Sequence, residues 1–280
     1  MSHKIGVIGG SGVYNLDGMQ IIQEHIVETP FGSPSDKIIE AKINGASCFF
    51  LPRHGRGHTI LPHEVNYCAN IFALKKLGIK YLISVSAVGS LIEDCPPKTF
   101  VLPDQFIDWT KGLRRRTFFG EGIVAHVSTA VPIARELQSL IYESCQKHDV
   151  KCSRGGAYLC IEGPQFSSKA ESEIYRGFGA KVIGMTNVPE AYLAKEAGIA
   201  YATIAMVTDF DCWKEVHCSV EEIMKVMHIN NHAVQEILKD VIPALNEKNI
   251  EYTQENQNAV MTTYEGLSAA QKEILDVLMG

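Results

Sequence analysis

Residues 5–13 read IGVIGGSGV, an apolar run that ends in a glycine-rich turn. The residues from Lys4 to Ile8 have the pattern of a buried strand, and Gly9 to Gly12 have the composition of a turn that ends it. Turns of this kind expose backbone N–H groups, and after a strand they often hold a phosphate group. The stretch therefore indicates a strand-turn unit with a candidate anion site at its end.

A dinucleotide-binding fingerprint is one interpretation of this turn. It requires G-x-G-x-x-G, and a helix must follow. Gly10 and Gly12 supply the first two glycines, but position 15 is asparagine and the segment after it is a poor helix start. Two other interpretations stay open. The turn either holds no ligand, or its N–H groups and the Ser11 hydroxyl bind a smaller anion.

Strand and helix patterns alternate along the rest of the chain. Ile38–Ile43 and Ser47–Leu51 predict a hairpin, because Asn44-Gly45 is a two-residue turn signal. Further strands are predicted at 81–88, 100–102, 105–107, 157–161, 181–185 and 200–207, and helices at 63–77, 132–148, 168–177 and 189–197. This alternation predicts an α/β fold with a mixed central β-sheet flanked by helices, in a single domain over residues 1–280.

Two capping boxes mark helix starts near the end of the chain. Ser219 with Glu222 starts a long helix that runs to about Leu245, and Ser268 with Gln271 starts a last, amphipathic one. Residues 247–266 between them are polar and aperiodic, so we expect a loop there.

The composition argues against several classes of protein. The 280 residues carry a formal net charge of −6, which disfavours nucleic acid or an anionic membrane surface as partner. No stretch approaches the roughly 20 apolar residues of a membrane span, and the N-terminus lacks a signal-peptide pattern, so we expect a cytoplasmic protein. The eight cysteines form no C-x-x-C pair and the ten histidines no H-E-x-x-H motif, so we expect reduced thiols and no metal site.

Polar residues follow two further strands and could complete an anion site. Arg53 and His54 come directly after FFLP; arginine offers a planar fork to two phosphate oxygens, and histidine adds a donor. The stretch SAVGS, from Ser86 to Ser90, offers hydroxyls and backbone donors. Each group alone is also typical of a solvated turn. Because ligands of α/β sheets lie at the carboxyl ends of strands, we expect these groups to meet the glycine turn.

Two later strand ends have the chemistry of a purine site. The stretch GPQFSS offers Phe166 for stacking and the hydroxyls of Ser167 and Ser168. The stretch TDFD carries Asp209 and Asp211, which face one side of a strand because they are two residues apart. Close carboxylates raise one pKa, which keeps a proton available for a purine nitrogen. A solvated acidic turn or a helix-capping pair is the alternative.

Taken in order, these segments resemble the family of trimeric purine nucleoside phosphorylases and methylthioadenosine phosphorylases, and most of all its methylthioadenosine branch. The resemblance rests on IGVIGGSG, TPFGSPSD, RHGRGHTILPHEVNYCANIFALK, SAVGSL, DQFID, IEGPQFSSKAES, GMTNVPEAYLAKEAGI and MVTDFDCWK. It runs to about Leu245, so the tail from about residue 247 is not covered. It implies the nucleoside-phosphorylase fold and the cleavage of a purine nucleoside by phosphate.

The resemblance also implies roles for individual residues. Those expected to bind phosphate are Ser11, Arg53, His54, Ser86, Ala87 and Thr186. Phe166 and Met185 are expected at the sugar, and Ser167, Asp209 and Asp211 at the purine, with a protonated Asp209 as the donor to N7. His126 is expected to reach into a neighbouring subunit's site, which implies a homotrimer. Inorganic phosphate is a co-substrate, and no metal or organic cofactor is implied.

Two features indicate which nucleoside is the substrate. In this family an aspartate in TDFD goes with 6-aminopurines, because a carboxyl group can accept a hydrogen bond from the adenine amino group. The resemblance also places Val220, Ile223 and Met224 near the 5′ substituent, and Val220 suits an apolar methylthio group. These three residues could also simply pack as core. We predict phosphorolysis of 5′-methylthioadenosine to adenine and 5-methylthioribose 1-phosphate, a step in purine and methionine salvage.

Other functions stay open. Ser11 and Ser86 stand where this branch often has threonines, and Asn187 replaces another threonine. If His217 enters the site, a 5′-hydroxyl would be accepted and adenosine would become a substrate. The alternatives are a phosphorylase for adenosine, inosine, guanosine or methylthioinosine, and a nucleoside-binding protein without catalysis.

Overall fold

The strand that opens the chain lies in the middle of a large sheet. The computed structural model describes residues 4–10, 12–13, 18–214, 220–250, 252, 254 and 256–280. In it β1 (Lys4–Gly9) pairs in parallel with β4 (Ala46–Pro52) on one side and with β5 (Ile79–Ser90) on the other. The residues from Ile5 to Ile8 are all buried, as expected of a central parallel strand covered on both faces.

The remaining strands extend this sheet in both directions. They are β2 (Gln20–His25), β3 (Ile38–Ile43), β6 (Phe100–Leu102), β7 (Gln105–Trp109), β8 (Cys152–Arg154), β9 (Ala157–Ile161), β10 (Ala180–Gly184) and β11 (Ala200–Phe210). The main order is β2-β3-β4-β1-β5-β10-β9-β7, while β11 pairs with β5 and β6, and β6 pairs with β8. The long strand β5 therefore connects the main path of the sheet to the branch formed by β11, β6 and β8. It pairs in parallel with β1 and β11, and antiparallel with β10 near its end.

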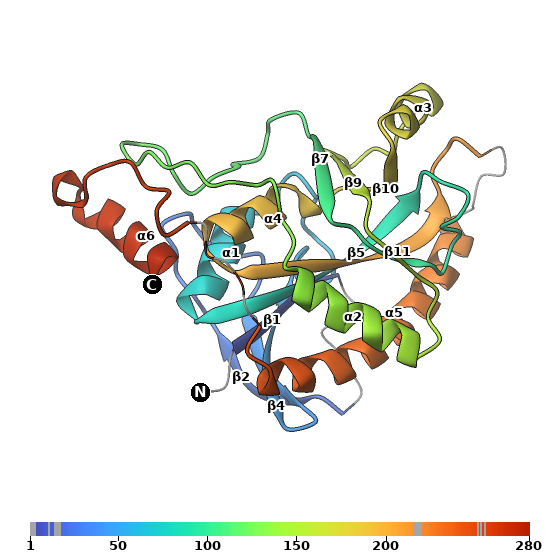
Figure 1. Ribbon diagram of the computed structural model, residues 1–280, viewed down its shortest axis with the longest axis horizontal. Coiled ribbons are helices and arrows are strands. Elements are labelled where there is room, and N and C mark those ends of the chain that lie inside the picture. The colour runs from blue at the N-terminus through green and yellow to red at the C-terminus, as the bar shows by residue number, and fades with distance from the viewer. Residues whose placement is uncertain are drawn as a thin grey trace.

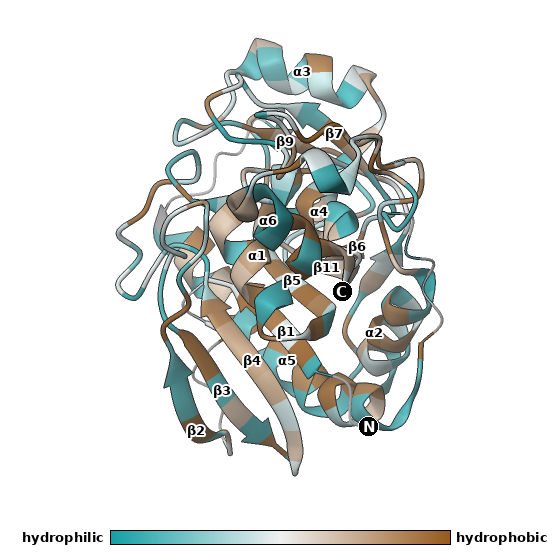
Figure 2. Ribbon diagram, turned by 90° about the vertical axis from the view of Figure 1, so that its left-hand side faces the viewer, coloured by the Kyte–Doolittle hydropathy of each residue, from teal (hydrophilic) through white to brown (hydrophobic). Residues whose placement is uncertain are grey.

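Helices cover both faces of the sheet. Figure 1 shows α1 (Tyr67–Lys76), α4 (Asn187–Glu196) and α6 (Ala269–Met279) on one side, and α2 (Arg135–Lys147) and α5 (Val220–Glu247) on the other. The short α3 (Lys169–Gly177) stands apart from them near β7, β9 and β10. Hydrophobic residues follow the central strands, whereas α3 and β2 carry mostly hydrophilic ones (Figure 2). In the part of the chain that the structure describes, none of the helices has the length and apolar character needed to cross a membrane.

The predicted α/β fold with a mixed sheet is confirmed, and so are most elements. The Asn44-Gly45 turn joins β3 to β4, with φ of +49° and +85°, the left-handed pair that a two-residue hairpin turn requires. The Ser268–Gln271 capping box is present, since Ser268 Oγ accepts from Gln271 N and Gln271 Oε1 accepts from Ser268 N. The corresponding box at Ser219 lies outside the described residues.

Three helix starts differ from the prediction by two or more residues, and two strands were not predicted. Helix α4 starts at Asn187, two residues before the predicted start. Helix α1 starts at Tyr67 and not at position 63, because the Asn66 side chain caps it by accepting from Ala69 N. Helix α2 starts at Arg135, three residues after the predicted start. The strands β2 and β8 were not predicted; β2 is mostly exposed, so burial does not impose an alternating pattern on it.

Candidate active site

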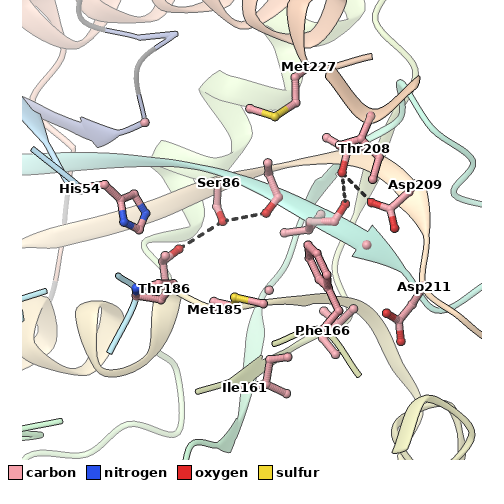
Figure 3. A pocket seen from close by; sticks show the side chains of 18 of the residues that line it. His54, Ser86, Ile161, Phe166, Met185, Thr186, Thr208, Asp209, Asp211 and Met227 are labelled. Atoms are coloured by element: carbon pink, nitrogen blue, oxygen red, sulfur yellow. Dashed lines mark hydrogen bonds between the residues drawn. The ribbon is translucent and has the colours of Figure 1, made fainter. Parts of the chain in front are cut away.

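The strand ends singled out in the sequence meet around one cavity of about 310 Å³ (Figure 3). That volume is at the lower end of the range for small-molecule sites. Its lining includes Gly10 after β1, Arg53 and His54 after β4, Ser86 and Ala87 in β5, Phe166 and Ser167 after β9, Met185 and Thr186 after β10, and Asp209 and Asp211 at the end of β11. Ile223 and Met227 of α5 also line it. The sheet topology explains this convergence, because β1, β4, β5 and β11 run parallel and end at the same edge.

One end of the cavity, called the anion end below, is lined by His54, Ser86 and Thr186, whose polar groups can bind an oxyanion. The hydroxyl oxygen of Ser86 lies 3.2 Å from that of Thr186 and 3.3 Å from that of Tyr158. Figure 3 shows Ser86, Thr186 and His54 together at this end. Hydroxyl groups can each donate to an anion oxygen and also accept from a neighbour, so this cluster can turn its hydrogens toward a bound anion.

The glycines of the first turn have different roles. A Cβ at Gly9 would lie 2.4 Å from Val13, and a Cβ at Gly12 would lie 2.2 Å from Asn231 of α5, so both are required for packing. A Cβ at Gly10 would meet no heavy atom within 4 Å, and Gly10 lines the cavity. Gly10 is thus the position where the backbone borders space for a ligand. Ser11, predicted as the side-chain donor of this turn, lies outside the described residues.

Arg53 lines the same end, but its planar fork is already engaged. Its Nε donates to Glu190 Oε2 at 2.7 Å, and its Nη2 donates to Glu190 Oε1 at 3.0 Å. Its Nη2 also donates to Ser84 Oγ, and its Nη1 donates to the Val85 carbonyl oxygen. A guanidinium has five N–H groups, so one Nη1 N–H is left over from these bonds. The sequence predicts that this fork binds two phosphate oxygens; with these bonds in place, Arg53 has one N–H left to offer an anion.

His54 also differs from expectation. Its Nδ1 lies 2.9 Å from the Ile60 carbonyl oxygen, which can only accept, so Nδ1 carries the hydrogen. Burial lowers the pKa of His54 to about 4, and the positive charge of Arg53 acts in the same direction. The ring is neutral at pH 7, which leaves its Nε2 as an acceptor. His54 can therefore accept from a P–OH group, whereas the sequence analysis assigned it the role of a donor.

The other end of the cavity holds two carboxyl groups. Burial raises the pKa of Asp209 to about 6 and also raises the pKa of Asp211, and the charge of Asp211 adds to the shift at Asp209. Asp209 Oδ1 lies 2.7 Å from the hydroxyl of Thr208, a residue that the sequence analysis passed over. Among the described residues, Asp211 Oδ2 and Ser167 Oγ are buried and make no hydrogen bond of good geometry, although the hydroxyls of Ser172 and Ser167 act on Asp211 and lower its pKa against the effect of burial. Buried polar atoms of this kind are costly unless a ligand satisfies them.

Apolar side chains separate the two ends. Met185 and Phe166 lie between the hydroxyl cluster and the carboxyl groups in Figure 3, and the Phe166 ring is 80% exposed at the rim. From α5, Ile223 and Met227 line the cavity, whereas Met224 is 58% exposed and is not among the lining residues. The Val220 side chain and His217 lie outside the description.

His126 does not line the cavity of its own chain. It is exposed, and its backbone N–H donates to the Ala259 carbonyl oxygen in the tail. The predicted role of His126 in a second subunit stays a prediction.

Four buried polar residues that were not predicted lie behind the anion end. Glu190, Ser84, Tyr201 and Tyr158 are buried and surround Arg53 and Ser86. The one available signal was Glu190, a charged residue inside an otherwise apolar helix start. Within the described ranges, no group of three or more His, Cys, Asp or Glu side chains could hold a metal ion.

Comparison with known proteins gives a consistent result. The family model described as Phosphorylase superfamily matches residues 4–243. The chain is 47% identical over 283 residues to S-methyl-5'-thioadenosine phosphorylase of Geobacter sulfurreducens, a match that covers 100% of this chain and 99% of that protein.

Solved structures agree with the curated relatives. A methylthioadenosine phosphorylase from an Antarctic soil metagenomic library matches with a TM-score of 0.94 at 43% identity, covering 100% of this chain and 99% of the other. Methylthioadenosine phosphorylase of Schistosoma mansoni, solved in complex with adenine, matches with a TM-score of 0.83 at 37% identity, covering 88% of this chain and 93% of the other.

Proposed function

The chain belongs to the phosphorylase superfamily, and on that basis we propose that it cleaves 5′-methylthioadenosine with inorganic phosphate. The products are adenine and 5-methylthioribose 1-phosphate. The observation that carries this proposal is a single cavity with an oxyanion end, two carboxyl groups of raised pKa at the other end, and an apolar middle. These parts match the phosphate, the purine and the thiosugar of the reaction in that order.

In the reaction, phosphate attacks the anomeric carbon while the bond from that carbon to purine N9 breaks. The transition state has the character of an oxocarbenium ion, which the anionic phosphate stabilises. Phosphate is held by the Gly10 backbone, the hydroxyls of Ser86 and Thr186, and the remaining N–H of Arg53. Its own P–OH donates to Nε2 of His54. Holding both reactants in one cavity supplies much of the rate enhancement through positioning and electrostatics.

The leaving purine takes the electron pair of the broken bond and gains a proton at N7. Asp209 supplies this proton, because burial keeps a fraction of it protonated near neutral pH. Asp211 and Ser167, which line the cavity beside Asp209, bind the purine edge. An aspartate pair suits a 6-amino group, which donates, better than a 6-oxo group, which only accepts.

The 5′ substituent faces an apolar wall. Ile223 and Met227 of α5 line the cavity, and a methylthio group packs on such residues without an unsatisfied polar atom. A 5′-hydroxyl would lose its hydrogen bonds to water there. This supports 5′-methylthioadenosine over adenosine as the preferred substrate.

We also propose that the active form is a homotrimer to which His126 contributes across the subunit boundary. The exposed Phe166 ring at the rim supports this, since a single chain leaves the cavity open on that side. Light scattering should give three times the 30.9 kDa chain mass, and a monomer mass would contradict it.

A nucleoside panel tests the substrate assignment. Phosphate-dependent cleavage is measured for 5′-methylthioadenosine, adenosine, inosine and methylthioinosine, and the values of kcat/KM are compared. We expect 5′-methylthioadenosine to be cleaved fastest. A higher kcat/KM for inosine or methylthioinosine would refute the 6-amino assignment, a higher value for adenosine would refute the 5′ assignment, and binding without turnover would indicate a nucleoside-binding protein.

A further inference from the structure

Glu190 is a fully buried carboxylate that touches neither the cavity nor solvent. It lies in α4, and the hydrogen bonds it receives converge from three other elements. Arg53 after β4 donates two of them, at 2.7 and 3.0 Å. Ser84 of β5 donates at 2.7 Å and Tyr201 of β11 at 2.9 Å. An ion pair this deeply buried is weak evidence for stability, because desolvation offsets its attraction, so another role must be sought.

The orientation of Arg53 is set by this arrangement. The Nε–Nη2 edge faces Glu190, Nη2 also reaches Ser84 Oγ at 2.7 Å, and Nη1 reaches the Val85 carbonyl oxygen at 3.0 Å. With four N–H groups committed, the guanidinium plane has no rotational freedom. The fifth N–H, on Nη1, has one direction only, and Arg53 belongs to the cavity lining.

We propose that Glu190 is a positioning residue for phosphate: it holds Arg53 so that the single uncommitted Nη1 N–H is aimed at the anion end of the cavity. This inference rests on the proposed function, because it assumes that the anion is the phosphate co-substrate. The positive charge of Arg53 is largely balanced by Glu190, so Arg53 acts through the direction of one donor more than through net charge. Fixed donors of this kind cost no reorganisation when the substrate binds.

Two ideas about Glu190 make opposite predictions. If its charge mattered most, Glu190→Gln would release the charge of Arg53 and lower the KM for phosphate. If its position matters, the amide has one oxygen and cannot accept from both Nε and Nη2 of Arg53, so Arg53 turns and the KM for phosphate rises. We expect a rise of about 10- to 100-fold, the range for removing a partner that orients a contacting group. The KM for the nucleoside should stay within about twofold.

The chain offers a matched control. Arg114 and Glu162 form a second buried pair, with Arg114 Nε donating to Glu162 Oε1 at 2.6 Å and both residues 5% exposed. Neither residue lines the cavity. Glu162→Gln should therefore lower the melting temperature to a similar degree as Glu190→Gln, without a selective change in the KM for phosphate.

The experiment compares kcat and both KM values for the wild type, Glu190→Gln and Glu162→Gln. A milder variant, Tyr201→Phe, removes one donor to Glu190 and keeps the volume, and it should raise the KM for phosphate about two- to tenfold. If Glu190→Gln does not fold, Tyr201→Phe decides alone. A KM for phosphate that falls, stays constant, or moves in step with that of the nucleoside would overturn the proposal.

Calorimetric titration of inorganic phosphate into the same proteins, without nucleoside, separates this inference from the proposed function. If the wild type binds phosphate and Glu190→Gln binds it at least tenfold more weakly, the inference stands even where no nucleoside is cleaved. If the wild type cleaves its nucleoside and Glu190→Gln binds phosphate as tightly as the wild type and Glu162→Gln do, the inference alone fails.

Discussion

Asp209 lies in the cavity with its carboxyl group largely withdrawn from water, and this burial raises its pKa to about 6. Only the protonated form can donate to purine N7, so kcat/KM should fall as the pH rises above about 6. Asp209→Asn keeps the shape but cannot transfer a proton. We expect a loss of about 100- to 10,000-fold in kcat/KM for 5′-methylthioadenosine.

The measurement is kcat/KM between pH 5 and pH 9 at saturating phosphate, for the wild type and Asp209→Asn. Ionisation of phosphate affects both proteins equally, so the difference between the two profiles belongs to Asp209. A variant with near-normal turnover, or with an unchanged alkaline limb, would contradict the proton-donor role.

Substitutions at Gly10 and Gly12 distinguish an effect on phosphate binding from an effect on the stability of the fold. A Cβ at Gly10 meets open space, and its φ is not left-handed, so Gly10→Ala should change the free energy of unfolding by no more than about 1 kcal/mol. The added methyl group enters the space proposed for phosphate, so the KM for phosphate should rise at least tenfold.

Gly12→Ala is the contrasting variant. Its methyl group would collide with Asn231, and we expect a destabilisation of about 1–3 kcal/mol. Thermal unfolding and the KM for phosphate of both variants check these expectations. A Gly10→Ala protein with normal phosphate kinetics would place the anion elsewhere in the cavity.

At the scale of elements, the C-terminal end of α4 is tied to the loop after β7 by a buried carboxyl group. Glu196 accepts from Thr117 Oγ1 at 2.7 Å and from Phe118 N at 2.9 Å, and burial raises its pKa to about 7. Its folded pKa therefore exceeds the ordinary value of 4.5. The stabilisation that comes with the bound proton is complete below pH 4.5 and is lost as the pH rises through 7.

Glu196→Gln keeps an acceptor for Phe118 N and has no charge to bury. Its advantage over the wild type should therefore grow by on the order of 2 kcal/mol between pH 5 and pH 8. Urea unfolding of both proteins at these two pH values measures the difference. The other buried acidic residues are the same in both proteins, so their contributions to the pH dependence of the unfolding free energy cancel. A constant difference would mean that Glu196 is already ionised at pH 5.

Elements with a strong local signal could be predicted from the sequence, and those determined by distant contacts could not. The β3–β4 hairpin depends on Asn44-Gly45, and helix α6 on its own capping box. The tail pairs with the loop that carries His126: Ala125 and Val260 form a β-bridge, 135 residues apart in the chain. Nothing local in either segment indicates that pairing, and the sequence predicts for residues 247–266 only the loop that most of the described residues there form.

At the scale of the whole molecule, the sequence was informative about groups that face the cavity and uninformative about those that hold them. Ser86 and Asp209 lie near the ends of the parallel strands β5 and β11, which ligands of α/β sheets favour, and Thr186 follows β10, which runs antiparallel to β5 and pairs with its end. Glu190 is as buried as the apolar side chains around it. Its hydrogen-bond donors come from residues in or after β4, β5 and β11, which only the packing of α4 against the sheet brings close. For His54 the cause is local: its Nδ1 donates to the carbonyl of Ile60, six residues further along the chain, so Nε2 is an acceptor where a donor was predicted.

The central claim is that this single cavity joins phosphate to the thiosugar of a 6-aminopurine nucleoside. The most direct test incubates the protein with 5′-methylthioadenosine, with and without inorganic phosphate, and follows adenine by chromatography and phosphorus by ³¹P NMR. We expect adenine and a sugar 1-phosphate in equal amounts, and neither product without phosphate. Adenine release at the same rate in phosphate-free buffer, with no new phosphorus resonance when phosphate is present, would contradict it.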